Sequence, residues 1–302
     1  MSRQVGDVHA PASLPQRFHD PFSDLSLVKS SLAALGDGAE CPRQAWITEN
    51  LACSRGATID GQLQTADGVA HRLWVVPAGA GEAIAALFRE VPALYVADGH
   101  HRSAAASRVA AARRAANPRH TGEESYNTFL TVIFPHHQMQ ILDYNRVVAD
   151  LNGMDATAFL ARLGRSFSVE KSSAPVKPGG AAEFGLYLAG QWHRLALRRE
   201  LIPVSDPVAR HDATLLSDHV LGPILGITDL RRDKRIDYVG GIRGPAELKK
   251  RVDRGEMAAA FSLRPTSMEE LMAVAEAGKV MPTKSTWFEP KLADGMVSLV
   301  LD

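Results

Sequence analysis

Apolar and polar residues follow two different periods along the chain, which indicates a mixture of helices and strands. Apolar residues three and four positions apart predict helices, and short apolar or alternating runs between turn residues predict strands. The predicted helices span residues 24–35, 81–90, 103–116, 154–163, 206–225, 245–254 and 266–277. The predicted strands span residues 69–76, 93–97, 126–134, 139–142, 167–170, 184–188, 192–197, 236–239, 257–263 and 297–301.

Turn and cap residues support several of these boundaries. Asp67-Gly68 predicts the turn of a hairpin, and Ala189-Gly190-Gln191 predicts another between strands 184–188 and 192–197. Asp155 is suited to cap helix 154–163, and Thr266 or Ser267 is suited to cap helix 266–277.

The order of elements predicts an α+β fold with mixed sheets, because strands and helices alternate without a regular βαβ rhythm. Residues 1–45 carry four prolines and few apolar residues, so we expect a weakly structured N-terminal segment. We expect a first domain over residues 46–153 and a C-terminal α+β lobe over residues 154–302.

Composition narrows the class of protein. The chain has 302 residues, 45% hydrophobic and 23% charged, and its formal net charge is zero, which does not favour binding to nucleic acid. It has two cysteines, Cys41 and Cys53, which we interpret as reduced thiols. There is no apolar run long enough to span a membrane and no secretory signal at the N-terminus, so we expect a cytoplasmic protein.

The densest chemistry lies in the turn Asp98-Gly99-His100-His101-Arg102, between the predicted strand 93–97 and an Ala-rich helix. The start of a helix binds anions through its N–H groups and dipole, and Gly99 lets a ligand approach the backbone closely. Arg102 can donate two hydrogen bonds to a phosphate, and the two histidines titrate near neutral pH. The alternative is structural: Asp98 caps the helix and the histidines are solvated.

Three further groups are candidates for anion binding. Lys284 and Ser285 lie in a proline-flanked stretch, and Arg243 lies in a glycine-rich connection from a strand to a helix. Asn145 and Arg146 follow the predicted strand 139–142 and are suited to a carboxylate substrate. For Lys284 and Ser285 the alternative is a surface turn with a solvated lysine. For Arg243 it is a tight connection between strand and helix, and for Arg146 it is a structural arginine bonded to backbone carbonyls. A metal site at His211-Asp212 and Asp218-His219 lacks further ligands at matching positions, so we do not favour it.

The segment Ala97–Arg102 resembles the signature turn of the ParB/sulfiredoxin-like superfamily, and in particular the DGHHR turn of its free serine kinases. More broadly, the chain resembles a bacterial family known as domain of unknown function 1015. The segments that carry this resemblance are 95–102, 125–134, 142–153, 237–244, 255–260 and 281–291. The resemblance implies a ParB/sulfiredoxin-like core followed by the C-terminal lobe.

The resemblance implies a kinase of free serine or of a similar small hydroxyl compound, with ATP or ADP as donor and Mg²⁺ as cofactor. Asp98, His100 and His101 would be catalytic, and Asp98 would hold the metal. Gly99, Arg102 and Ser103, together with Arg243, Lys284 and Ser285, would bind the nucleotide, and Asn145 and Arg146 the substrate. The alternative is a module that binds a nucleotide or phosphorylated metabolite without chemistry.

One feature of the resembled families has no counterpart in this sequence. Residues 1–60 contain no Lys-His-Glu-x-Thr-like motif and no convincing equivalent of the N-terminal glutamate that the serine kinases are thought to use as a base. We therefore expect a member of the family that is shortened at its N-terminus, that is active only together with another segment, or that is inactive.

Overall fold

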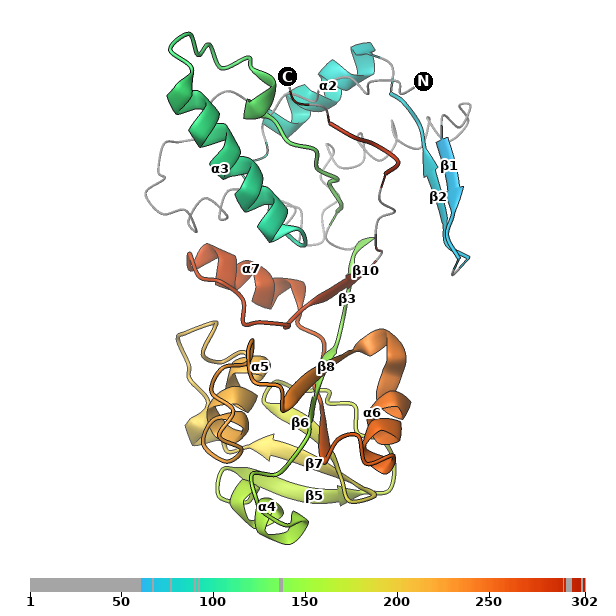
Figure 1. Ribbon diagram of the computed structural model, residues 1–302, viewed down its shortest axis with the longest axis vertical. Coiled ribbons are helices and arrows are strands. Elements are labelled where there is room, and N and C mark those ends of the chain that lie inside the picture. The colour runs from blue at the N-terminus through green and yellow to red at the C-terminus, as the bar shows by residue number, and fades with distance from the viewer. Residues whose placement is uncertain are drawn as a thin grey trace. The chain divides into compact units, whose positions relative to one another are not determined.

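The computed structural model describes residues 61–66, 68–76, 78–89, 91, 93–135, 138–289, 291, 295–299 and 301. The chain divides into two compact units, one formed by residues up to 139 and from 290 onward, the other by Gln140–Glu289 (Figure 1). Helices and antiparallel sheets occur together, which confirms the α+β class. The predicted helix 24–35, the segment 1–45 and both cysteines lie outside the described residues.

The described part of the first unit contains a hairpin, two helices and a short 3-10 turn. Strands β1 (Gly61–Gln64) and β2 (Ala70–Leu73) pair antiparallel, and the N–H of Gly68 donates to the carbonyl of Thr65 at 2.9 Å, so the predicted hairpin is confirmed. The helices are α2 (Ala78–Arg89) and α3 (His100–Ala116), and the 3-10 turn is Ser125–Asn127. Helix α3 begins three residues earlier than the sequence predicted.

Three strand predictions in this unit are wrong. Residues 128–135 form no regular strand, and Phe129, Leu130 and Val132 are 43%, 51% and 54% exposed. Within 93–97 only Leu94 forms a bridge, and the described part of 297–301 contains no strand. High β-propensity indicates a side chain that fits a half-buried sheet, and the ladder itself also needs a partner strand.

The second unit is built on a six-stranded antiparallel sheet. Its strand order is β5-β7-β6-β9-β4-β8, and β3 and β10 form a separate two-stranded sheet. The strands are β3 (Gln140–Leu142), β4 (Tyr144–Val148), β5 (Phe167–Ser172), β6 (Glu183–Leu188), β7 (Gln191–Leu197), β8 (Ile236–Gly240), β9 (Ala259–Ser262) and β10 (Trp287–Glu289). The predicted hairpin of β6 and β7 is confirmed, with Ala189 and Gly190 at positive φ in its turn.

The helices of the second unit are α4 (Ala156–Leu163), α5 (Asp212–Leu216), α6 (Gly244–Asp253) and α7 (Met268–Glu276). Asp155 caps α4, and Ser267 and Glu270 form a capping box at the start of α7, as predicted. The predicted helix 206–225 is much shorter. His211 has extended backbone and accepts from the N–H of Ala213, so the helix begins at Asp212 and continues as a π-helix over Ser217–Leu221.

Each face of the six-stranded sheet has its own apolar core. The larger core packs α4, α5 and the π-helix against one face, with Phe159, Leu216 and Phe261 fully buried. The smaller core packs Leu248 of α6 against Val147 and Ala260 on the other face. Because β4 lies between β8 and β9, its last four residues, Asn145–Val148, are all buried.

The structure starts the second unit at residue 140, whereas the sequence analysis expected the first domain to extend to residue 153. The second unit begins at Gln140, because β3 and β4 pair with β10, β8 and β9, which come from the last third of the chain. Among the helices of the described part, none combines the length and the apolar character needed to cross a bilayer.

Gly185 in β6 allows a close approach that any side chain would block. It pairs with Ser262 of β9, whose hydroxyl donates to the carbonyl of Val176 at 2.6 Å. A Cβ on Gly185 would lie 2.1 Å from Ser262 Oγ and 2.8 Å from Val176 O. Position 185 therefore requires glycine, because any Cβ would clash with Ser262 and Val176.

We predict that Gly185→Ala lowers the free energy of unfolding by about 3 kcal/mol, because the inserted methyl group overpacks a buried site. Urea denaturation measures the change. Gly179→Ala is the matched control, because a Cβ there meets nothing within 4 Å and its φ is not positive. Equal stability of the two variants would contradict this account of β6.

Candidate functional site

The turn before α3 brings one carboxylate and two cations together. Asp98 Oδ1 accepts the N–H of Gly99 at 2.8 Å, and its Oδ2 lies 3.0 Å from Lys291 Nζ. Lys291 comes from the C-terminal part of the same unit. The sequence singled out Lys284 in the 281–291 stretch, but Lys291 is the lysine of that stretch that pairs with Asp98.

The backbone of this turn places a glycine at positive φ directly before the first turn of α3. Gly99 has a φ of 82°, in the left-handed region that favours glycine, and as the N-cap residue of α3 it has no side chain with which to cap the helix. The N–H groups at the start of α3 therefore have no intrahelical acceptor and lie at the positive end of the helix dipole. Arg102 packs over the glycine, since a Cβ on Gly99 would lie 3.2 Å from its Nη2. The hydroxyl of Ser103 donates to the carbonyl of Gly99 at 3.3 Å.

Asp98 is held as a carboxylate. Burial raises its pKa, but hydrogen bonds from Lys291 and the Gly99 N–H, with the charges of Lys291 and Arg102, lower it, and the net shift is downward. His100 and His101, the predicted catalytic pair, are the first two residues of α3. The side chain of His101 is exposed, and that of His100 lies outside the described part. No group of three or more metal-ligating side chains occurs among the described residues. Asp98 therefore offers Mg²⁺ one carboxylate, a number that suits a metal held partly by phosphate oxygens.

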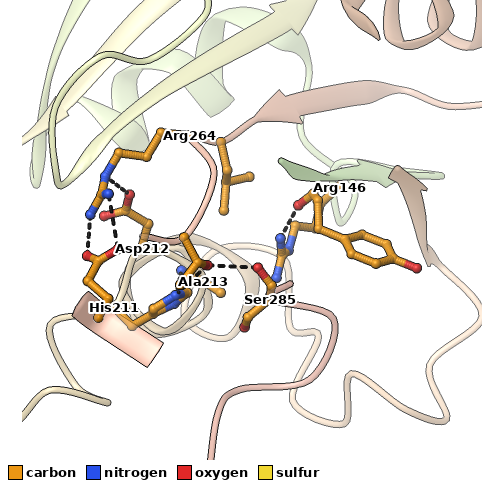
Figure 2. Close-up of a pocket in the computed structure, with 10 residues that line it drawn as sticks. Arg146, His211, Asp212, Ala213, Arg264 and Ser285 are labelled. Carbon is orange, nitrogen blue, oxygen red and sulfur yellow. Dashed lines mark hydrogen bonds and ion pairs between the residues drawn. The ribbon is translucent and has the colours of Figure 1, made fainter. Parts of the chain in front are cut away.

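The second unit contains a separate polar pocket (Figure 2). It lies between the start of β4, the start of α5, the β9–α7 connection and the loop before β10. The residues that line it are Tyr144, Arg146, His211, Asp212, Ala213, Leu263, Arg264, Thr266, Glu270 and Ser285. It has room for the centre of about one water-sized group.

Arg146 is the most isolated charge of this pocket. It is 2% exposed, one of its Nη groups donates to the carbonyl of Tyr144, and its guanidinium lies 5.6 Å from the ring centre of Tyr238. No carboxylate of the described residues forms an ion pair with it. Burial lowers its pKa to about 10, although nearby Tyr238, Tyr144 and Asp212 oppose the shift.

Arg264, in contrast, is held between two carboxylates (Figure 2). Its Nε lies 2.8 Å from Asp212 Oδ2, as an ion pair without hydrogen-bond alignment, and its two Nη groups donate to Glu270. Burial raises the pKa of Asp212. Burial also acts to raise the pKa of Glu270, but the bonds from Arg264 and the Ser267 N–H give a net lowering. The charge of Arg264 is thus neutralised within the protein.

His211 is a neutral structural link in this pocket. Its Nδ1 accepts the N–H of Ala213 at 3.2 Å, so Nε2 carries the proton and donates to Thr266 Oγ1 at 3.0 Å. The Thr266 hydroxyl donates onward to the carbonyl of Ser285 at 2.8 Å. Burial lowers the pKa of His211 to about 4, aided by the charges of Arg146 and Arg264 and opposed by Glu270.

Two of the candidate groups from the sequence meet at this pocket. Arg146 and Ser285, far apart in sequence, both line it. Lys284, at a positive φ of 57°, places its Nζ 5.7 Å from the ring centre of Tyr144, which also lines the pocket. The buried Ser285 hydroxyl donates to the carbonyl of Pro282 at 2.8 Å.

Two other candidates do not line the pocket. The side chain of Asn145 is buried and bonded within the protein, donating to Asp143 and accepting the N–H of Leu263 at 3.0 Å. Arg243 is exposed at the start of α6, where its charge helps to lower the pKa of Asp237.

Sequence reasoning missed Arg264, Glu270 and Thr266 as members of a site. The capping box was the available signal, since it predicted where Glu270 would lie, but it gave no reason to pair it with Arg264. For His211 the sequence favoured a packed or capping role over a metal site, and the structure has His211 as the cap of α5, while Asp212 bonds the backbone and Arg264.

The pKa of His211 predicts a loss of stability in mild acid. The ordinary value of 6.5 applies to the unfolded chain and about 4 to the folded one, so only the unfolded chain takes up a proton in this range. The free energy of unfolding should fall by up to about 3 kcal/mol as the pH drops from 6.5 to 4. We expect His211→Gln, which cannot titrate, to have a shallower slope in urea denaturation across this range. Parallel slopes for the two proteins would contradict the assignment.

No curated protein matches the chain. Among solved structures, it is similar to a mutant free serine kinase in complex with AMP, with a TM-score of 0.38 and 15% identity over 65% of this chain and 68% of that one. A mutant free serine kinase in complex with ADP gives a TM-score of 0.35 and 15% identity over the same shares. A conserved hypothetical protein from Pyrococcus furiosus gives 0.36 and 16% identity over 66% and 71%.

A family model gives the clearer relation. Residues 43–217, more than half of the chain, match the family described as "Protein of unknown function (DUF1015)". The chain belongs to this DUF1015 family.

Proposed function

We propose that the Asp98–Arg102 turn binds the phosphates of ATP or ADP and that the protein transfers a phosphoryl group to serine or a similar small alcohol. One observation supports this most directly. The start of α3, behind a glycine at positive φ, has Arg102 and Lys291 beside it. Helix dipole, guanidinium and ammonium all favour an anion at the same place.

Each residue of the turn has a role in this proposal. The N–H groups after Gly99 and the guanidinium of Arg102 hold phosphate oxygens, and Ser103 keeps the first turn of α3 in place through its bond to Gly99. Lys291 exchanges Asp98 for a phosphate oxygen when the nucleotide binds. Asp98 is then available to orient the acceptor hydroxyl or to hold Mg²⁺, which neutralises phosphate charge when bound.

The transfer forms a bond from the acceptor hydroxyl oxygen to the terminal phosphorus and breaks the bond from that phosphorus to the bridging oxygen. ATP leaves as ADP, or ADP leaves as AMP. The hydroxyl proton passes to His100 or His101, or directly to water. In such reactions catalysis comes mainly from positioning and from stabilising charge, which an arginine, a lysine and backbone N–H groups can supply.

A specific observation favours the alternative, a module that binds a nucleotide without chemistry. Both oxygens of Asp98 already accept a hydrogen bond, one from the Gly99 N–H and one from Lys291, so the carboxylate is engaged within the protein and not directed at an acceptor hydroxyl or a metal. In that case the turn would sense a nucleotide or a phosphorylated metabolite.

The test is a phosphoserine assay on the full chain with Mg²⁺, serine and either ATP or ADP. We expect turnover in the wild type and a loss of about 100-fold or more in Arg102→Ala, because a cation that stabilises transferring phosphate is removed. Asp98→Asn should lose activity while retaining nucleotide binding in calorimetry.

Arg108→Ala is the matched control, since Arg108 is an exposed arginine further along the same helix. It should behave like the wild type. Nucleotide binding that Arg102→Ala abolishes, with no phosphoserine in any protein, would support the module instead. Turnover that persists unchanged in Arg102→Ala would contradict both functions for this turn.

A further inference from the structure

We propose that the pocket of the second unit is a binding site for a carboxylate group of a small molecule, with Arg146 as its partner. The proposal concerns binding by the second unit and does not depend on the phosphoryl transfer proposed for the turn before α3.

The first argument is the shortage of hydrogen-bond acceptors around the buried guanidinium of Arg146. A guanidinium has five N–H donors, and a buried charge is costly unless it is paired and hydrogen-bonded. In the described structure the guanidinium of Arg146 donates to one carbonyl, that of Tyr144, and lies over the ring of Tyr238. An anion in the pocket would supply the missing acceptors.

Arg235, in the same unit, shows what a structural arginine looks like in this protein. It donates to the carbonyls of Leu225 and Gly226 and forms ion pairs with Asp233 and Asp150. Its hydrogen-bonding capacity is satisfied from several sides although it is more exposed than Arg146. The contrast indicates that Arg146 is kept for a ligand.

The second argument is that the other charged and titratable groups around the pocket are already neutralised or bonded. Arg264 is paired with Asp212 and Glu270, and both ring nitrogens of His211 are bonded. Asp212 and Glu270 together carry one more charge than Arg264, which offsets the charge of Arg146 from a distance, but Arg146 is the one cation among the lining residues that has no ion pair. A monoanion adds one negative charge next to Arg146, whereas a phosphate dianion would add two beside the carboxylates of Asp212 and Glu270.

Size and surroundings agree with a carboxylate. The pocket has room for about one water-sized group, which is enough for one carboxylate oxygen to reach Arg146 while the rest of the molecule lies outside. Planar guanidinium and carboxylate groups can form two parallel hydrogen bonds. Lys284 adds a second cation close to the pocket, because its Nζ lies over the ring of Tyr144, one of the lining residues.

The test is thermal denaturation and calorimetry of the full chain with acetate and lactate at constant ionic strength. Acetamide is the neutral isostere, and inorganic phosphate is the competing anion. We expect saturable stabilisation by acetate and lactate, and none by acetamide or phosphate. In the wild type labelled with ¹⁵N-arginine, a buried Nε signal should shift with acetate and should be absent from Arg146→Gln.

Arg146→Gln should lose the response to acetate entirely. Since that variant removes a buried side chain and can fail to fold, Lys284→Ala is the second variant, and we expect about a 3-fold weaker affinity from loss of one nearby cation. Lys234→Ala, another exposed lysine of this unit, is its control and should bind as the wild type does.

Three outcomes would overturn the proposal. Stabilisation by acetamide equal to that by acetate would show that charge is not recognised. Binding of phosphate without binding of acetate would assign the pocket to a different ligand class. An acetate response that persists in folded Arg146→Gln would place the bound anion elsewhere.

Discussion

The register of β4 between β8 and β9 decides which side chains reach each face of the large sheet. Arg146 pairs with Tyr238 on one side and Phe261 on the other, while Val147 and Val148 enter the two opposite cores. A slip of one residue would turn every side chain of β4 to the other face, burying Arg146 where a valine now packs. The pocket and both cores therefore depend on the same set of backbone hydrogen bonds.

The fold was predictable where the evidence was local. The β6–β7 hairpin, the Asp155 cap and the capping box of α7 all follow from residues within a few positions of each other, and the structure has them. Residues 126–134 were misread because their apolar, β-branched character describes a strand that needs a distant partner. The length of the helix after His211 was also missed, because its start is set by a side chain bonded to backbone.

The sequence predicted which residues of the candidate site carry suitable chemistry, but not which of them come together in the fold. The sequence identified Asp98, Gly99 and Arg102 because they are neighbours in one turn. It also selected Arg146 and Ser285, but as members of different groups, and only the folded sheet brings them to one pocket. The pairing of Lys291 with Asp98 and of Arg264 with Asp212 joins positions far apart in the chain, for which periodicity and motif spacing carry no signal.

The pairing of β3 with β10 brings the two ends of the second unit together. Gln140 and Glu289, the two ends of the second unit, face each other across one antiparallel ladder. Opposed residues in such a ladder have Cα atoms about 5 Å apart. The second unit thus has the arrangement of a cassette inserted into the sequence of the first, with its entry and exit side by side.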